Sequence, residues 1–315
     1  MSGDRALCRP TVAAVVPCHN AAATLAATLE SVLAQAAVAE VIVVDDGSSD
    51  ATLAIARAFE PRARVLTGPN RGVSAARNRG LAETMADWLL LVDADDLLTP
   101  GTVAARVDTA LASGADVVIC DWEEIDGEGR ASGAPARSVD WQALAADPET
   151  ALATDVWAPP AAILYRRSLA ERIGGFRTDL PVVEDARFLF DAAYHGARLA
   201  HAPHVGARYR IMPGSLSRRD PALFWQCVLR NGRQIEALWR ARGELDAARR
   251  QAVRGIYNHA ARGLFAAAHP AYFEAVGALR GVGLPLPRHS RVATPLARAV
   301  GLGVARSILR AVGHA

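Results

Sequence analysis

The stretch WLLLVDADDLLTP, Trp88–Pro100, decides the fold, because in it an apolar run is followed at once by three carboxylates. Leu89–Val92 has the length of a buried strand. Asp93, Asp95 and Asp96 cannot all be buried unpaired, but at the carboxyl end of a parallel strand they would face the crevice where open α/β sheets bind ligands. Mg²⁺ or Mn²⁺ would neutralise them, since these ions take carboxylate and phosphate oxygens. The stretch therefore indicates a metal-assisted site for a phosphorylated substrate.

A solvated turn or a helix cap is the alternative interpretation of the same acidic cluster. Thr99-Pro100 has the pattern of a helix start, which acidic residues often precede. The rest of the chain has to decide between a site and a cap.

Strand-like and helical segments alternate before this stretch. Glu40–Val44 is the most strand-like run, and its unbroken apolarity suits a parallel strand covered on both faces. The other expected elements are strands at 12–16 and 64–66 and helices at 24–35, 50–58 and 73–84. Repeated strand–helix units with short turns predict an α/β fold with a mostly parallel, doubly wound sheet.

The second part of the chain is less regular. The expected elements are a helix at 101–113, strands at 116–120 and 161–165, a helix from Glu184 to Tyr194, and two short strands at 198–201 and 205–211. Three glycines and a proline predict a loop at 127–135. The last ninety or so residues are helical by composition.

Charge is distributed unevenly, although the formal net charge is only +2. Residues 1–220 hold 21 arginines against 29 acidic residues, and residues 221–315 hold 14 against 4. This basic tail suggests an anionic surface as a partner. Its apolar residues Leu296, Val300, Val304 and Ile308 recur every four residues, as on a helix that lies on a membrane surface, packs on the protein body or contacts another subunit.

The remaining composition predicts a cytoplasmic protein, with peripheral contact to the inner face of the cell membrane as a further expectation. The four cysteines are widely spaced, so they read as reduced thiols rather than as a metal or redox motif. No signal peptide and no membrane-spanning apolar run is evident in the sequence.

Three stretches together resemble one known family. VVPCHNAAATL at 15–25, VVDDGSSD at 43–50, and GPNRGVSAARNRGL at 68–81 followed by LLLVDADD at 89–96 are similar to the nucleotide-sugar domain of family 2 inverting glycosyltransferases. That resemblance implies the GT-A variant of a nucleotide-binding α/β sheet. It implies that residues 1–120 bind the nucleotide sugar and residues 121–220 the acceptor. The resemblance fades past Pro221, and composition alone predicts a helical basic region at 221–315.

The resemblance also assigns roles on the donor side. It places Pro17 and Asp46 at the nucleobase, which points to a UDP donor, and Arg77 near the base and diphosphate, where a guanidinium suits phosphate. Asp93 and Asp95, with Asp96 beside them, match the metal-binding acidic pair. The expected cofactor is Mn²⁺ or Mg²⁺, which would bridge the donor phosphates. Arg210 resembles a basic residue near the diphosphate at the end of the domain.

Glu184-Asp185 resembles the family's acidic pair on the acceptor side, one member of which is the general base. At the start of a helix the dipole favours the ionised carboxylate. Asp185 is the first choice for the base and Glu184 the reserve.

The predicted function is therefore metal-dependent, inverting transfer of a hexosyl or N-acetylhexosaminyl group from a UDP-sugar to a saccharide or lipid-linked saccharide acceptor. Nucleic acid is not an expected partner, and a homo-oligomer is possible. A catalytically inactive family member that binds a nucleotide or a partner is the alternative. A nicotinamide-dependent dehydrogenase is disfavoured because Pro17–Ala22 contains no glycine. A phosphatase with an Asp-x-Asp nucleophile would carry it on the first strand.

Overall fold

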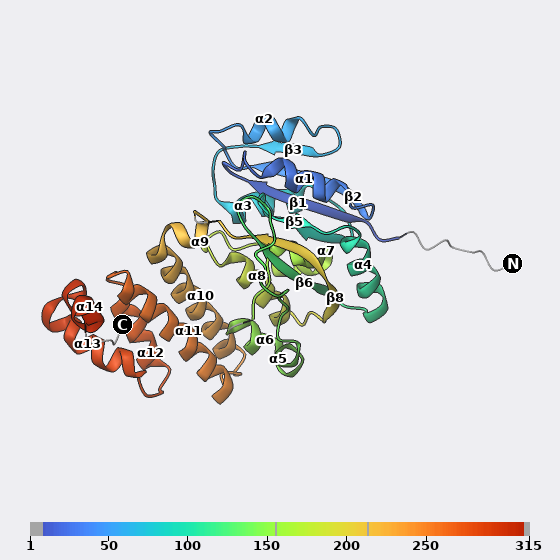
Figure 1. Ribbon diagram of the computed structural model, residues 1–315. Coiled ribbons are helices and arrows are strands. Elements are labelled where there is room, and N and C mark those ends of the chain that lie inside the picture. The colour runs from blue at the N-terminus through green and yellow to red at the C-terminus, as the bar shows by residue number, and fades with distance from the viewer. Residues whose placement is uncertain (1–8, 155, 213, 312–315) are drawn as a thin grey trace. The chain divides into compact units, whose positions relative to one another are not determined.

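The computed structural model describes residues 9–154, 156–212 and 214–311. The chain divides into two compact units, each built from separate segments (Figure 1). The first unit comprises residues 1–141, 157–178 and 191–212, and the second comprises residues 142–156, 179–190 and 213–315. The predicted boundaries at residues 120 and 220 describe functional parts, so this structural division follows different lines.

A parallel half-sheet forms the first part of unit 1. Its strands lie in the order β3-β2-β1-β4, and each pairs in parallel with its neighbour. They are β1 (Val12–Cys18), β2 (Val38–Asp45), β3 (Arg64–Thr67) and β4 (Trp88–Leu91). Every residue of β1 and β4 is buried, as the apolar runs predicted. The doubly wound parallel arrangement is thus confirmed for this half.

The second half of the sheet is mixed. It continues from β4 as β7-β6-β8-β5, with antiparallel pairs at β4–β7, β7–β6 and β8–β5 and a parallel pair at β6–β8. The strands are β5 (Leu97–Leu98), β6 (Val117–Ile125), β7 (Ile163–Arg166) and β8 (Leu199–Arg210). Two antiparallel steps restore the direction of β4, so β4, β6 and β8 end at the same edge of the sheet.

The helices of unit 1 cross between these strands (Figure 1). They are α1 (Leu25–Leu33), α2 (Thr52–Arg57), α3 (Val73–Ala82), α4 (Thr102–Ser113) and α7 (Arg167–Ile173), with a short 3₁₀ turn η1 (Pro160–Ala162). In α3, Gly80 lets the helix approach the sheet closely, because a Cβ there would lie 2.3 Å from a methyl carbon of Val15.

Unit 2 is helical. Its helices are α5 (Trp141–Ala146), α6 (Pro148–Ala153), the start of α8 (Glu184–Tyr194), α9 (Leu216–Arg219), α10 (Pro221–Ala241), α11 (Ala247–Ala266), α12 (Tyr272–Gly281), α13 (Arg288–Val300) and α14 (Leu302–Ala311). The predicted helical C-terminal region is confirmed. Among the described residues, no helix is both long and apolar enough to cross a membrane.

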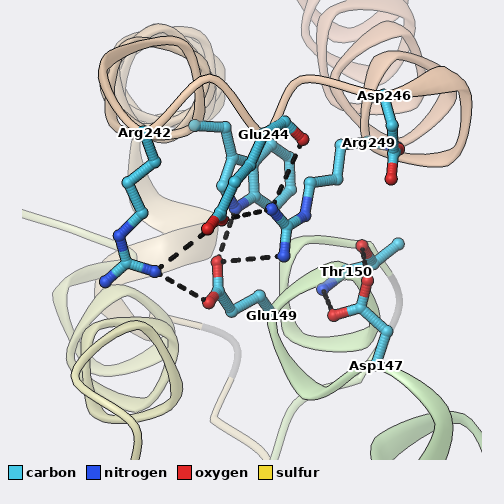
Figure 2. Close-up of polar contacts among 8 residues, drawn as sticks. Asp147, Glu149, Thr150, Arg242, Glu244, Asp246 and Arg249 are labelled. Carbon is cyan, nitrogen blue, oxygen red and sulfur yellow. Dashed lines mark hydrogen bonds and ion pairs between the residues drawn. The ribbon is translucent and has the colours of Figure 1, made fainter.

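A polar network fastens α6 to the turn between α10 and α11 (Figure 2). The Glu149 carboxylate accepts a hydrogen bond from the Trp239 indole at 2.6 Å and pairs with Arg242 at 3.2 Å and Arg249 at 3.7 Å. Arg249 also pairs with Glu244 at 2.5 Å. Because Glu149 is only 12% exposed, these contacts compensate a largely buried charge.

Two predicted boundaries are wrong. The two short strands expected at 198–201 and 205–211 are one strand, β8, with a bulge: Cys120 pairs with Ala202 and Asp121 with Val205. Pro203, which has no N–H for the ladder, lies in the bulge. The continuous row of apolar residues expected near the C-terminus is divided between α13 and α14 at Gly301, whose φ is +83°.

Candidate active site

The carboxyl edge of the parallel half-sheet gathers the predicted donor-side residues. The chain order changes direction between β1 and β4, since β2 lies on one side of β1 and β4 on the other. Such a switch point is where open α/β sheets bind ligands. Backbone hydrogen bonds tie the strand ends together: Asp46 N–H donates to the Cys18 carbonyl at 2.9 Å and Val92 N–H to the Val15 carbonyl at 3.1 Å. Asp46 and Asp93 therefore follow β2 and β4, the strands on either side of β1, at one edge of the sheet.

Pro17 lies inside β1 rather than after it. It is buried and pairs in register with Val44 of β2. The exposed residues that follow the strand are His19 and Asn20, and the Asn20 side chain accepts a hydrogen bond from Ser49 N–H at 2.8 Å. Asn20 has a φ of +50°, in the left-handed region that asparagine tolerates better than most residues. This loop was not among the predicted site residues, although Asn in a tight post-strand turn is a recognisable signal.

The Asp46 carboxylate holds the loop before α3. One of its oxygens accepts from Arg71 N–H and the other from Gly72 N–H, both at 2.8 Å. Asp45, by contrast, points inward, where its carboxylate accepts from the Thr67 hydroxyl at 2.9 Å. Each Asp46 oxygen keeps a second lone pair, so the residue can anchor the loop and still accept a further hydrogen bond.

Arg77 connects α3 to the acidic cluster. Its guanidinium donates to the Asp93 carboxylate at 2.6 Å and is only 2% exposed. The Phe176 ring lies 5.2 Å from the guanidinium carbon, a cation–π distance. Asn78 positions Phe176, because its side chain donates to the Phe176 carbonyl at 2.8 Å and accepts from the Phe176 N–H at 2.6 Å. Arg77 thus orients and partly neutralises Asp93.

The Asp95 carboxylate lies in an electrostatically unfavourable environment. Burial, and then the neighbouring charge of Asp93, raise its pKa to about 6. The Arg210 guanidinium opposes this rise, but its Nε donates to the Asp95 backbone carbonyl at 2.7 Å and not to the side chain. In the part of the chain that the structure describes, the Asp95 carboxylate has no salt bridge to a basic side chain. A cation from solution would relieve the repulsion.

Asp96 lies deeper than the other two carboxylates of the predicted metal-binding set. Its side chain is fully buried and points away from solvent, where one oxygen accepts from Arg210 N–H at 2.9 Å. Desolvation, followed by the charges of Asp95 and Asp93, raises its pKa well above the ordinary value. Asp96 fastens the acidic turn to the end of β8.

The residues that remain fit a hard divalent ion of the Mg²⁺ or Mn²⁺ kind. Across the three described ranges, no group of three His, Cys, Asp or Glu side chains is placed to hold one metal ion. Asp93 and Asp95 are two carboxylates on partly exposed side chains with unfavourable mutual charge. Mg²⁺ commonly uses one or two carboxylates and completes its shell with water and substrate phosphate. A two-carboxylate site for a metal–phosphate complex therefore matches the donor set.

Arg210, which the resemblance places near the diphosphate, uses its guanidinium to bind backbone carbonyls. It is 6% exposed and donates to the carbonyls of Asp95, Asp126 and Gly127 at 2.7, 3.1 and 2.8 Å. It thus holds the acidic turn against the end of β6. Asp96 and Arg210 are 114 residues apart in the sequence, so no local pattern indicates that they are in contact.

Glu184 and Asp185 begin α8 in unit 2, as predicted. Glu184 is 6% exposed, whereas Asp185 is partly exposed and its carboxylate accepts from Ala186 N–H at 2.7 Å. The preceding residue, Val183, has a φ of +63°, a rare conformation for a β-branched residue. Such strain is often found at functional sites. The two carboxylates thus lie at a helix start whose backbone is under constraint.

The chain matches the family model described as glycosyl transferase family 2 over residues 13–174. The protein therefore belongs to glycosyl transferase family 2. Among curated relatives, the succinoglycan biosynthesis protein ExoO of Rhizobium meliloti is 32% identical over 223 residues, which is 66% of this chain and 63% of that protein. The putative glycosyltransferase EpsH of Bacillus subtilis is 28% identical over 219 residues, again 63% of that protein. The chain thus spans less than two thirds of these relatives.

Solved structures confirm the fold. The S. aureus protein TarS, residues 1–349, in complex with UDP-GlcNAc matches with a TM-score of 0.68 and 18% identity, over 96% of this chain and 91% of that one. The mannosyltransferase PcManGT of Pyrobaculum calidifontis, in complex with GDP-Man and Mn²⁺, matches with a TM-score of 0.55 and 20% identity, over 96% and 87%. These likenesses establish the predicted α/β glycosyltransferase fold with its helical C-terminal region.

Proposed function

We propose that this protein transfers a hexosyl or N-acetylhexosaminyl group from a UDP-sugar to a saccharide or lipid-linked saccharide acceptor, with inversion at the anomeric carbon. The carrying observation is the edge of the parallel half-sheet, where Asp46 follows β2 and Asp93 and Asp95 follow β4. The Arg77–Asp93 contact at 2.6 Å holds one of these carboxylates in a fixed position. The relative named for succinoglycan biosynthesis, ExoO, supports a polysaccharide-building role.

Each donor-side residue has a proposed task. The second lone pairs of the Asp46 carboxylate accept a hydrogen bond from the uracil ring, beside the backbone of Pro17. Asp93 and Asp95 hold Mn²⁺ or Mg²⁺, which when bound supplies a Lewis acid that offsets negative charge on the leaving diphosphate. Arg77 orients the Asp93 carboxylate. Asp96 and Arg210 keep the acidic turn attached to β8.

Asp185 is the proposed general base. It accepts the proton of the acceptor hydroxyl as that oxygen attacks the anomeric carbon opposite UDP. The partial exposure of Asp185 favours it over Glu184, whose side chain is buried. Its position at the start of α8 favours the ionised form that a base requires. The protein is proposed to work in the cytoplasm.

UDP release from a panel of UDP-, GDP- and dTDP-sugars, with Mn²⁺, Mg²⁺ or a chelator, tests the donor and the metal together. We expect turnover with a UDP-sugar and a divalent ion, and loss of turnover with the chelator. Asp95→Asn should abolish it, whereas Asp108→Asn, at an exposed position in α4, should leave it unchanged. Equal turnover in Asp95→Asn and the parent would refute the metal site.

A second experiment separates catalysis from binding. Asp185→Asn should lower transfer by at least about a hundredfold, the usual contribution of a positioned base, while calorimetry with UDP and Mn²⁺ gives an unchanged dissociation constant. The same loss in Glu184→Gln but not in Asp185→Asn would move the base to Glu184. UDP binding without turnover on any donor would favour the inactive, nucleotide-binding alternative. The anomeric configuration of the product, read by NMR, tests inversion.

A further inference from the structure

The last two described helices present apolar side chains to solvent. In α13, Val292 and Val300 are 41% and 42% exposed, and in α14, Val304 and Ile308 are 53% and 41% exposed. Leu296 lies between the two α13 valines at the same spacing of four and is half-buried. These residues form one outward row on each helix, and the two helices pack against each other at the end of unit 2 (Figure 1). We call the two rows the apolar rim.

The inward faces of the same helices are built mostly from smaller residues. The buried residues of α13 are Ser290, Ala293, Thr294 and Ala297, and those of α14 are Ala305 and Leu309. A surface helix ordinarily turns its larger apolar side chains toward the core. Here most of the larger ones face outward, so packing within unit 2 does not account for the apolar rim.

The segment that carries the apolar rim is strongly basic. The last acidic residue of the chain is Glu274, and the 41 residues after it contain six arginines and no Asp or Glu. An open hollow of about 570 Å³ between α12 and α13 is lined by Arg280 and Arg298, together with Thr294, Pro295 and Ala299. A second hollow, of about 310 Å³, includes Arg262, Arg306 and Arg310 in its lining. Both hollows offer guanidinium groups, which suit phosphate.

We propose that α13 and α14 dock on the surface of an anionic lipid bilayer. The apolar rim enters the boundary between headgroups and acyl chains, and the surrounding arginines bind lipid phosphates, with Arg280 and Arg298 forming a headgroup site. An amphipathic surface helix binds a bilayer through this combination of buried apolar area and attraction to anionic lipids. Helices of 13 and 10 residues lie on a bilayer and do not span it.

Charge complementarity selects this partner over a second copy of the chain. Two copies that met through this same surface would bring like charges together, since no acidic residue follows Glu274. A nucleic acid would satisfy the arginines but would leave the exposed valines without a partner. A bilayer with anionic headgroups satisfies both. The inference does not depend on glycosyl transfer, because lipid binding is measured without substrate.

Co-sedimentation with vesicles tests the proposal on the full chain. The protein should bind vesicles of phosphatidylcholine mixed with phosphatidylglycerol and should not bind vesicles of phosphatidylcholine alone. Binding should weaken as salt is raised, because lipid-surface attraction is screened. Absence of binding to the anionic vesicles would overturn the proposal.

Two variants separate the apolar and the basic contributions. Val300→Ser with Val304→Ser and Ile308→Ser removes most of the apolar rim at exposed positions, and Arg280→Gln with Arg298→Gln and Arg310→Gln removes three exposed charges. Each set should weaken binding at least about tenfold. Matched controls are Met85→Ser with Leu111→Ser, which are exposed in unit 1, and Arg57→Gln with Arg219→Gln and Arg250→Gln. The controls should bind as the parent does.

Circular dichroism establishes that each variant is folded, so a loss of binding reports on the surface. If the control variants lost vesicle binding to the same extent, binding would depend on the overall charge or apolarity of the protein and not on α13 and α14. That result would overturn the assignment. Light scattering tests whether the apolar rim instead binds a second copy of the chain. If the parent is a dimer that does not bind vesicles, and the serine variant is a monomer, the apolar rim is a dimer interface.

Discussion

The Arg77 guanidinium donates to the Asp93 carboxylate at 2.6 Å, and the two side chains differ sharply in exposure, at 2% and 31%. The arginine approaches from the interior while the carboxylate faces the edge of the sheet. The buried guanidinium of Arg77 thereby holds Asp93 in place. Within the described part of the chain, it forms no such salt bridge with the nearby Asp95 carboxylate.

Replacing this arginine should separate catalysis from general stability. Arg77→Gln leaves Asp93 without its charge partner, so we expect the rate of UDP release to fall at least about tenfold and the unfolding free energy to fall by about 1–3 kcal/mol. Arg77→Lys keeps the charge but loses the planar guanidinium. Its rate of UDP release and its unfolding free energy should lie between those of the parent and those of Arg77→Gln. UDP release and urea denaturation measure the effects. Arg79→Gln on the same helix serves as the control, and an equal loss there would contradict the proposed role.

The Cys18 thiol should be inert in the folded protein. Burial, then the negative charges of Asp45 and Asp50, raise its pKa to about 12. At pH 9 the thiol of the unfolded chain is about half ionised, whereas the folded thiol keeps its proton and cannot act as a nucleophile. Iodoacetamide followed by mass spectrometry should label Cys18 in urea and spare it in the native state. Native labelling as fast as in urea would contradict the burial.

The same pKa has a consequence for stability. A thiol that holds its proton more tightly in the folded state contributes stability that is present below pH 9 and is lost as the pH rises toward 12. Cys18→Ala removes this contribution to the pH dependence. Its unfolding free energy should therefore fall less steeply between pH 9 and 11 than that of the parent.

The network around Glu149 should be costly to break. Glu149→Gln weakens contacts with the Trp239 indole, Arg242 and Arg249 in a largely buried position. We expect a loss of about 1–3 kcal/mol in the free energy of unfolding of the helices concerned, measured by urea denaturation. Glu274→Gln breaks an ion pair whose glutamate is 62% exposed, and should change stability by less than about 1 kcal/mol. Equal effects would show that burial does not matter here.

Gly47 and Gly277 should respond in opposite directions to alanine. Gly47 has a φ of +72°, and a Cβ there would lie 2.7 Å from the backbone nitrogen of Asn70, so Gly47→Ala should destabilise the loop that Asp46 holds. Gly277 lies in α12 with open space around it, and Gly277→Ala should stabilise the protein by about 0.5–1 kcal/mol. Thermal unfolding and UDP affinity give the readouts. Only Gly47→Ala should weaken UDP binding.

The sequence predicted most accurately those strands and helices that are determined by residues close together in the chain. The apolar runs before Asp45 and Asp93 identified two parallel strands, and the periodicity of Glu184–Tyr194 gave α8 with the same bounds. In both cases the side chains that decide the structure are neighbours in sequence. The family resemblance then supplied the order of the motifs along the chain.

The sequence failed where distant contacts decide. Nothing in the sequence near Asp96 reveals that its side chain turns inward and accepts a hydrogen bond from Arg210 N–H. The bulge at Pro203 depends on its pairing with β6, and the break at Gly301 interrupts a spacing of four that the apolar residues continue on both sides. A pattern in one segment carries no information about such partners.

Unit 2 draws on three stretches of chain, and this has a consequence for how the protein is made. Glu149 precedes its indole partner Trp239 by 90 residues, so α6 leaves the ribosome long before α10 and α11 exist to receive it. Helix α6 can therefore make its native contacts only after α10 and α11 have been synthesised. A stop codon before α10 would remove more than a tail, because it would leave α6 without Trp239, Arg242 and Arg249, the partners of Glu149.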